Sequence, residues 1–589
     1  MKQILLTCLA VASSFTAFAQ TDVQPVVGKY GGDLYIALGT EDYSDDAKMD
    51  ATVNVDASQT AGQVDFSLPN FSFGGMSLGD IFLPSISLNE ADGVYTFGEN
   101  PDVRFNFLNG IIVADAHLDQ TRSYVKGDSI VAYIPVQWIQ GTENIPIYVL
   151  FKGKIMNPFD VENGTFNSEG RWTQSKPWDS VNGYFDWSAL EDNYDYWDSA
   201  KWQMDEYITP SPWCVSHVIG MNGIGATCVA QPVEVGNLDG SDMSDDDDYD
   251  TPKDYAIELK NTPNPFMATQ VVPGYMTLGT SWATANVMNL GTSADGGAFG
   301  GVAFQGKPDA IKFSYKRAFG KAKTSDDDEE GYDASTLNDK ESATVVAYLW
   351  KGTYAQADVP GNTAFGSPAT VTMYSRDRNI LDLTTTTGGA MTKSDNAACI
   401  ASVVKSLDAA DNWTEVIVPL DYGQYAGTEV LPDSLNLIFS ASDYFGDRSK
   451  VGAGNTLTVD NVQLIYYHAL KDVTFDGKVV SFNEANAADL SDVYYDAEKL
   501  QYVKVGEGAT VTTSYDESTA LLTLTVLAQD IKYRKDAQTV YTIQFGTVPE
   551  GINHATIENG QSVIYTIDGR RVNAMTKGVY VVNGKKVVK

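Results

Sequence analysis

The stretch "IVAYIPVQWI" (130–139), followed after a short linker by "IPIYVLFKGKI" (145–155), decides the fold of the N-terminal part of the chain. Apolar and polar residues alternate in both runs, and Val, Ile and Tyr predominate, which is typical of half-buried β-strands. The linker "QGTEN" contains Gly and Asn, which favour turns. The two runs therefore predict two strands joined by a tight turn.

The same pattern recurs along the rest of the chain, between Gly-rich and Asx-rich segments. The runs are "DLYIAL" (33–38), "QVDFSL" (63–68), "ATVVAYLW" (343–350), "TEVIVPL" (414–420), "SLNLIFSAS" (434–442), "LTVDNVQLIYY" (457–467), "LLTLTVLA" (521–528) and "VYTIQF" (540–545). Few stretches have a helical period with caps. The sequence therefore predicts an all-β protein built of several sandwiches or barrels.

The two ends of the chain and its length predict location and domain number. A chain of 589 residues is too long for one hydrophobic core. "MKQILLTCLAVASSFTAFAQ" has a Lys, an apolar run and "AFA" before Gln20, the pattern of a secretory signal peptide covering residues 1–19. No later stretch approaches the roughly 20 apolar residues of a membrane-spanning helix. We expect a secreted or surface-held protein without membrane insertion.

The net charge argues against certain classes of ligand, and the cysteine content limits the disulfides and metal sites that the chain can form. The formal net charge of -37 disfavours nucleic acid and anionic lipid, because affinity for both depends on Lys and Arg. Outside the signal peptide the Cys residues are Cys214, Cys228 and Cys399. A bridge between the first two would close a loop of about 15 residues and contribute on the order of 3 kcal/mol. With only four His and no paired C-x-x-C spacing, the sequence offers few ligands for a zinc site.

Residues 25–155 resemble a known family. The opening "GKYGGDLYIAL", the piece "LPNF" and the piece "GDI" resemble the calycin-like domain of secreted Bacteroidota proteins. The resemblance implies an up-and-down β-barrel of about eight strands. Such a barrel either encloses one apolar ligand or fills itself with side chains. No ligand-specific polar set stands out, which favours the filled barrel.

Residues 156–468 carry two further resemblances. "NPFDVENGTFNSEGRW" and "NTLTVDNVQLIYY" resemble the first and last strands of jelly-roll carbohydrate-binding modules, which pair in that fold. "NTPNPFMATQVVPGYMTLGT", "GGVAFQGKPDAIKFSYKRAF" and "DNWTEVIVPLDY" resemble the family labelled as a carbohydrate metabolism domain of Bacteroidota. The resemblance implies a large β-jelly-roll sandwich.

The C-terminal part resembles two smaller modules. Residues 469–548, from "DVTFDGKVVSF" to "VYTIQF", are similar to Ig-like or cadherin-like spacers. Residues 549–589, with "SVIYTIDGRRV" and "KGVYVV", resemble the C-terminal sorting module of type IX secretion substrates. That resemblance implies export to the cell surface or the medium. An ordinary short sandwich without a secretion role is the alternative.

The candidate ligand site is "EDNYDYWDSAKWQMDEYITPSPW" (191–213), with three Trp, three Tyr and six carboxylates. Sugar rings stack on aromatic planes, and carboxylates and amides bind their hydroxyl groups. The alternative is a loop that its own rings anchor to the sheet. Trp172 and Trp213 resemble framework residues. The predicted ligand-binding residues are Trp187, Tyr196, Trp197, Asp198 and Trp202.

A structural calcium site is predicted at the ends of the large sandwich. Related jelly-roll modules place carboxylates at the positions of Glu162 in "VENGTF" and Asp460 in "TVDNV". Paired terminal strands would bring the two together, and hard oxygen ligands suit calcium. Two exposed strand-end carboxylates are the alternative. The acidic runs 239–254 and 323–333 lack calcium-loop spacing and indicate solvated insertions.

No motif predicts catalysis. G-x-S-x-G, H-E-x-x-H and the P-loop pattern are absent from the sequence, and His217 is near Cys214 in sequence only. With 77 Asp and Glu, carboxylate pairs at glycosidase spacing arise by chance. The predicted function is a non-catalytic binder of polysaccharide, host or dietary glycan. The alternatives are a surface adhesin or structural protein with no glycan site, whose aromatic loop holds the fold or docks another protein, and, less favoured, a glycoside-active enzyme.

Overall fold

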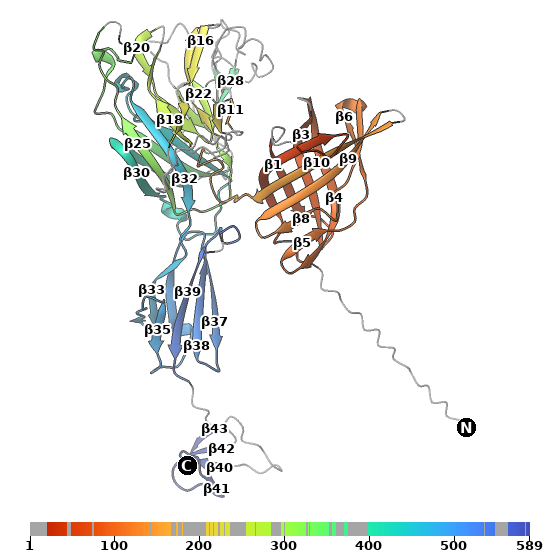
Figure 1. Cartoon of the computed structure of the whole chain (residues 1–589). Coiled ribbons are helices and arrows are strands. Elements are labelled where there is room, and N and C mark those ends of the chain that lie inside the picture. Colours follow the sequence, from red (N-terminus) through yellow and green to blue (C-terminus); the bar gives the residue numbers. More distant parts are fainter. Residues whose placement is uncertain are drawn as a thin grey trace, which may run out of the picture. The chain divides into compact units, whose positions relative to one another are not determined.

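The computed structural model is all-β, as the sequence predicts, and begins with a β-barrel followed by several further sheets (Figure 1). Contacts divide the chain into two units, Met1–Tyr466 with Lys532–Lys535, and Tyr467–Ile531 with Asp536–Lys589. The described residues are 21–43, 49–73, 76–140, 143–166, 172–174, 179–180, 208–210, 213–215, 217–221, 224–228, 230–235, 255–264, 267–283, 296–299, 301–325, 328, 330–352, 356–360, 370–374, 398–534, 536–547, 564–582 and 585–589.

The barrel is an antiparallel meander whose last strand pairs with its first. Its strands are β1 (Gly28–Leu38), β2 (Met49–Ala57), β3 (Gln63–Phe73), β4 (Met76–Ala91), β5 (Val94–Phe97), β6 (Val103–Phe107), β7 (Ile112–Ala116), β8 (Tyr124–Lys126), β9 (Ser129–Gln140) and β10 (Glu143–Ile155). β5 with β6, and β7 with β8, each occupy the place of one strand, because β5 pairs with β8 and β6 with β7. The wall is therefore eight-stranded.

Alternating side chains line the inside of the barrel. In β9, Ile130, Ala132, Ile134 and Val136 are buried and belong to one continuous apolar cluster with residues of the other strands. The first strand is fixed to this core by Tyr30, which is fully buried and whose hydroxyl donates to the carbonyl of Val26 at 2.8 Å. These buried side chains line the inside of the barrel, and the filled barrel stays a prediction.

The middle of the chain forms two facing antiparallel sheets. A six-stranded sheet contains β14 (Cys214–Val215), β21 (Tyr275–Thr277), β24 (Val302–Ala303), β26 (Ala343–Lys351), β29 (Ala398–Leu407) and β31 (Ser434–Ser440). A five-stranded sheet contains β17 (Ala230–Glu234), β18 (Tyr255–Lys260), β25 (Ala310–Ala318), β30 (Ala410–Pro419) and β32 (Thr456–Ile465). Phe313 of β25 and Phe439 of β31 meet edge to face, with ring centroids 4.9 Å apart, so the sheets pack against each other.

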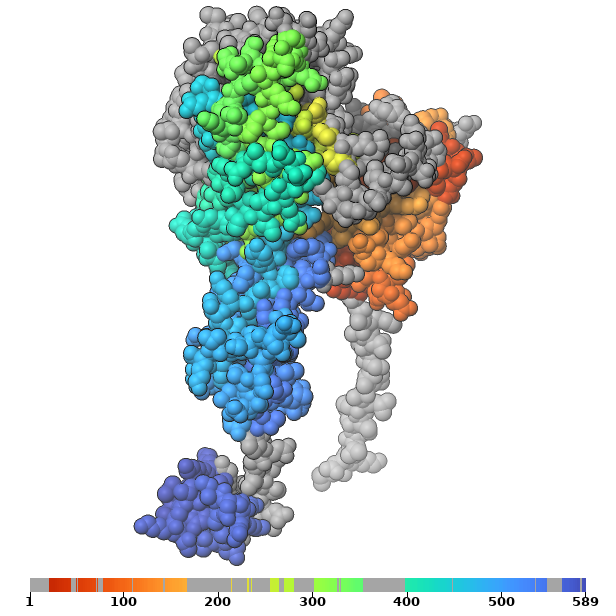
Figure 2. Space-filling view, turned by 60° about the vertical axis from the view of Figure 1, so that its left-hand side comes forward, coloured from red at the N-terminus to blue at the C-terminus, as the bar shows by residue number. Residues whose placement is uncertain are grey.

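The same part of the chain contains smaller strand pairs. They are β11 (Trp172–Gln174) with β13 (Ile208–Pro210), β15 (His217–Met221) with β16 (Ile224–Cys228), β19 (Thr262–Asn264) with β20 (Met267–Val272) and β27 (Gln356–Pro360) with β28 (Thr370–Tyr374). A three-stranded sheet contains β12 (Asp179–Ser180), β22 (Thr280–Ala283) and β23 (Gly296–Phe299). Figure 2 shows residues 301–350 in green beside the teal strands around residue 410, as the pairing of β25 with β30 requires.

The second unit contains a small sandwich and a short C-terminal sheet. The sandwich has β33 (Ala469–Phe475), β34 (Lys478–Val479) and β36 (Leu500–Val505) in one sheet, and β35 (Ala487–Leu490), β37 (Thr510–Asp516), β38 (Leu521–Leu527) and β39 (Gln538–Phe545) in the other. Leu522, Leu524 and Val526 alternate into its core. The C-terminal sheet has the order β41 (Arg571–Val572), β40 (Ile564–Thr566), β42 (Val579–Val582), β43 (Lys585–Val588).

Candidate functional site

Paired strands flank the aromatic-rich segment. β11 before it pairs antiparallel with β13 after it, with Trp172 opposite Pro210 and Gln174 opposite Ile208. The segment 175–207 between them is called the insertion, and its strand β12 pairs in parallel with β22. The predicted ligand-binding residues Trp187, Tyr196, Trp197, Asp198 and Trp202 lie in this insertion and outside the described residues, so their role stays a prediction.

The insertion returns to the sandwich through Trp213, which is a framework residue as predicted. Its side chain is 1% exposed, and its indole N–H donates to the carbonyl of Asn163 at 3.3 Å. The indole also contacts Phe166 and Phe439, with centroids 5.8 and 6.2 Å away. Cys214 follows directly on β14, at the edge of the six-stranded sheet. The anchored Trp213 thus fixes where the insertion emerges.

The outer face of the six-stranded sheet carries a second aromatic cluster. Register places Tyr348 opposite Asn436 and Val346 opposite Ile438, on the face opposite to Phe439, which points to the five-stranded sheet. The buried members of this outer cluster are Tyr275, Val346, Tyr348, Trp350, Ile438 and Tyr444. Each is at most 3% exposed. These side chains therefore form a second hydrophobic core on the outer face of the six-stranded sheet.

Polar groups within the same face are paired. The amide of Asn436 donates to the hydroxyl of Tyr348 at 2.7 Å, and its oxygen accepts from the hydroxyl of Thr277 at 2.6 Å. The backbone N–H of Gly279 also donates to that oxygen at 3.0 Å. Buried amides and hydroxyl groups need such partners to offset lost hydration. The network fixes the rotamers of the face.

A buried polar corner positions two of these aromatic side chains. Glu341 accepts from the backbone N–H of Gly452 at 2.8 Å and from the amides of Asn455 and Asn261 at 3.0 and 3.3 Å. Asn261 in turn accepts from the N–H of Gly274 at 2.9 Å, next to Tyr275. Its amide donates to the carbonyl of Ala441 at 3.3 Å, in the segment that leads to Tyr444. The corner thereby aligns Tyr275 and Tyr444, whose rings meet at 5.6 Å.

Burial shifts the pKa values of the two ionisable side chains in this corner. Burial raises the pKa of Glu341 to about 7, and hydrogen bonds from Gly452 and Asn455 oppose the shift. Burial lowers the pKa of Arg317 to about 10, although the charge of Glu341 acts in the opposite direction. Arg317 donates to the carbonyls of Ala441, at 2.9 Å, and of Glu341. Glu341 therefore titrates near neutral pH inside the sandwich.

The two predicted calcium ligands lie on segments that contact each other. The backbone N–H of Val462 on β32 donates to the carbonyl of Gly164 at 2.8 Å, so "VENGTF" runs beside the last strand of the sandwich. Asp460 is fully buried and accepts from the N–H of Asn461 at 2.6 Å. Glu162 lies 3.7 Å from the ammonium group of Lys29 and its side chain is 39% exposed. The calcium site stays a prediction.

The described residues contain no cluster suited to a metal ion, no reactive thiol and no membrane-spanning helix. Within the described ranges, no three His, Cys, Asp or Glu side chains group closely enough to hold a metal ion. Burial raises the pKa of the free Cys399 thiol to about 11, which disfavours the reactive thiolate. The Cys214–Cys228 bridge stays a prediction. In the described part of the chain, no helix is long and apolar enough to span a membrane.

Residues 26–154 match the family model described as calycin-like beta-barrel domain. The N-terminal barrel is calycin-like. A provisionally assigned outer membrane protein from Bacteroides fragilis is 19% identical, with a TM-score of 0.16, over 22% of this chain and 51% of that chain. A provisionally assigned glycoside hydrolase from Bacteroides thetaiotaomicron is 12% identical, with a TM-score of 0.25, over 72% of this chain and 86% of that chain.

These structural matches are distant. This chain spans about half the length of the Bacteroides fragilis protein. At such TM-scores neither structure carries an argument about fold or function here. No curated protein matches the sequence.

Reasoning from sequence missed both the outer aromatic face and the polar corner. Their members come from β21, β26, β31 and loops far apart in the chain, and no local motif joins them. The one local signal is the sequence of β26, whose residues Ala343–Trp350 are apolar except for Thr344 and have buried positions on both faces.

Proposed function

We propose that this protein is a secreted or cell-surface, non-catalytic glycan-binding protein, and that the insertion 175–207 carries its binding surface. The observation that supports this most is the pairing of β11 with β13, which closes the aromatic and acidic stretch into an insertion. The Trp, Tyr and Asp residues of this insertion suit the faces and hydroxyl groups of sugars.

The rest of the chain is assigned to support and export in this proposal. The sandwich of residues 156–468 positions the insertion, and calcium at Glu162 and Asp460 would tie its terminal segments together. Residues 469–548 act as a spacer. Residues 549–589 act as a type IX-like sorting module after removal of the signal peptide 1–19. The ligand is a polysaccharide or a host or dietary glycan.

A glycan array with the mature chain tests the proposal. We expect binding to at least one polysaccharide, and at least a tenfold loss of affinity in the Trp197→Ala, Trp202→Ala double variant. Trp413→Ala is the matched control, because Trp413 lies on β30, where its ring contacts Lys316 at 4.9 Å. Binding that survives in the double variant would contradict the assignment of the site.

The alternative is an adhesin or structural surface protein in which the aromatic residues of the insertion anchor it to the sandwich. If no glycan binds and the double variant unfolds at lower temperature than the parent, the adhesin function is the better one. Turnover of any glycan in a broad substrate panel would instead indicate a glycoside-active enzyme.

A further inference from the structure

The C-terminal sheet, formed by β40 to β43, has a charge opposite to that of the chain as a whole. Residues 564–589 contain six Lys and Arg and one Asp, whereas the whole chain has 40 Lys and Arg and 77 Asp and Glu. Among the described residues of this sheet, Tyr580 alone is buried, and its hydroxyl accepts from the backbone N–H of Thr576 at 3.0 Å. The loop before β42 therefore contacts the face of the sheet from which Tyr580 projects.

Strand register places a row of four side chains across the opposite face. Tyr565 lies opposite both Arg571 and Val581, and Val581 lies opposite Lys586. Directly opposite residues of antiparallel strands project from the same face. Because side chains alternate along a strand, Val581 and its row project away from the Tyr580 face. The strand order gives this cationic row the sequence Arg571, Tyr565, Val581, Lys586.

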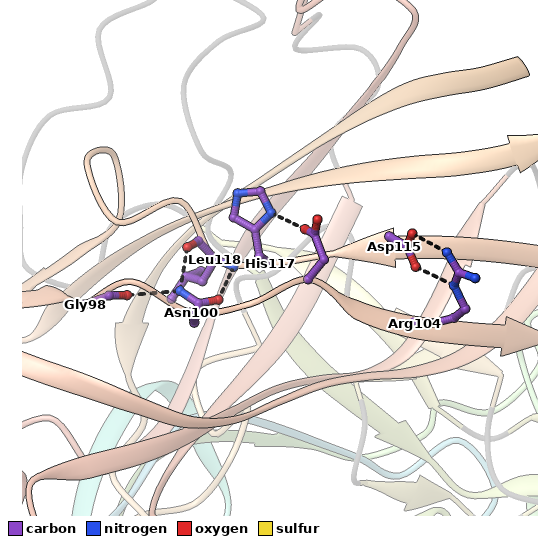
Figure 3. Close-up of polar contacts among 7 residues, drawn as sticks. Gly98, Asn100, Arg104, Asp115, His117 and Leu118 are labelled. Carbon is purple, nitrogen blue, oxygen red and sulfur yellow. Dashed lines mark hydrogen bonds and ion pairs between the residues drawn. The ribbon is translucent and has the colours of Figure 1, made fainter.

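The two cations of the row have no carboxylate partner in the described part of the chain. Arg571 and Lys586 are exposed, and the residues opposite them in the register are uncharged. The barrel has a different arrangement at such a cross-strand position. There Arg104 lies opposite Asp115 and donates from two nitrogens to both carboxylate oxygens, at 2.8 and 2.7 Å (Figure 3). The carboxylates that would complete the cationic row can therefore come from a partner.

The spacing of the row defines the shape of that partner. Neighbouring strands are about 4.8 Å apart, so three spacings put the two cations roughly 14 Å apart, with the uncharged pair between them. An extended chain rises about 3.3 Å per residue and projects every second side chain to one side, so carboxylates at positions i and i+4 lie about 13 Å apart. Residue i+2 then faces the centre of the row. Val579 and Val588, which pair on the same face, extend this apolar centre.

We propose that the cationic row binds an extended acidic segment of a protein partner, with carboxylates at positions i and i+4 and an apolar side chain at i+2. The carboxylates pair with Arg571 and Lys586, and the apolar side chain contacts Tyr565 and Val581. An anionic lipid surface fits the row less well, because Tyr565 and Val581 are half-buried between exposed cations. A projecting side chain reaches such recessed groups, whereas lipid headgroups attract cations whatever their spacing.

The test uses the mature chain and a fluorescent peptide with Glu at i and i+4, Phe at i+2, and Ser and Thr elsewhere. We expect the Arg571→Glu, Lys586→Glu double variant to bind it at least tenfold more weakly than the parent at 150 mM salt. Lys577→Glu, Lys585→Glu is the matched control, because it changes the charge of the module equally at two exposed residues outside the row. Lys585 projects from the other face of β43, so we expect the control to bind nearly as tightly as the parent.

A second peptide, with Lys in place of both Glu, checks that the row variant is folded and that its charges are placed as proposed. We expect this peptide to bind the row variant more tightly than it binds the control variant, since the two variants have the same net charge.

Three outcomes would overturn the proposal. The parent might fail to bind the Glu peptide, or the row and control variants might be weakened equally, which would show attraction by charge without a site. Row-dependent binding to phosphatidylglycerol vesicles without row-dependent peptide binding would assign the row to lipid. The peptide assay uses purified protein, so these outcomes leave the sorting role of residues 549–589 and glycan binding by the insertion 175–207 to their own tests.

Discussion

At the scale of single residues, two carboxylates buried in the large sandwich have different surroundings. Asp460 lies on β32 beside the segment that carries Glu162, and the next residue, Asn461, has φ of 52°. Glu341 instead faces the N–H groups of Gly452, Asn455 and Asn261. A buried carboxylate requires either a cation or several donors. Glu341 has such a donor network, whereas calcium at Asp460, which also accepts from the backbone N–H of Asn461, stays a proposal.

Removing calcium should destabilise the sandwich through Asp460. A metal at a hundred times its dissociation constant stabilises a fold by about 2.7 kcal/mol, which corresponds to roughly 5–10 °C in a domain of this size. We expect chelation to lower the midpoint of thermal unfolding by about that amount, and Asp460→Asn to abolish the response. Asp328→Asn, in an exposed turn, is the control. An unchanged midpoint on chelation would remove the calcium site.

The pKa of Glu341 should make stability depend on pH. Its folded pKa of about 7 lies above the ordinary value of 4.5, so the folded state binds the proton more tightly. Stability should therefore fall as pH rises from about 5 to above 7, by on the order of 3 kcal/mol at 1.36 kcal/mol for each pKa unit. Urea unfolding across this range should show a flatter profile for Glu341→Gln. Glu415→Gln, in the exposed pair with Lys312, should keep the slope of the parent.

At the scale of elements, close backbone contact between β1 and β10 closes the barrel. Gly32 lies opposite Gly153, and a Cβ atom at Gly32 would lie 2.1 Å from the carbonyl oxygen of Lys152. Phe151 fills the space beside Gly153, where a Cβ would lie 2.5 Å from its ring. The closing pair of strands therefore excludes side chains at both glycines.

Gly32→Val should open this closing pair. Because the atoms it would meet belong to the backbone of β10, only a strand shift can relieve the clash, and we expect a loss of at least 3 kcal/mol. Chemical denaturation monitored by circular dichroism measures the change. Asp33→Val on the same strand should cost far less, since that side chain is half-buried and adds no backbone clash. Equal losses in both variants would contradict the close-approach argument.

At the scale of the whole molecule, the two units have separate hydrophobic cores. The barrel cluster includes Phe66, and the small sandwich of the second unit is built around Leu524. Both side chains are fully buried. Separate cores allow each unit to unfold in its own transition.

Calorimetry of the mature chain should therefore show more than one transition. Leu524→Ala removes a core side chain at a typical cost of about 2–5 kcal/mol and should lower only the transition of the second unit. Phe66→Ala should lower the transition of the barrel instead, because it also removes a core side chain. A single transition that moves with both substitutions would indicate one cooperative unit.

The sequence alone determined the all-β class, the meander barrel and the framework role of Trp213. Alternation is a local property, and it specifies which face of each strand is buried wherever one face meets a core. The hydrogen bonds of the Asn100 side chain between β5 and β6, the cationic row of the C-terminal sheet and the Glu341 corner were decided only by tertiary structure. Each of these features joins residues that are distant in sequence or interrupts a regular strand. No spacing of residue types in the sequence therefore predicts it. That the first and last segments of the large sandwich lie side by side was expected from the jelly-roll resemblance, and in the folded structure the N–H of Val462 donates to the carbonyl of Gly164.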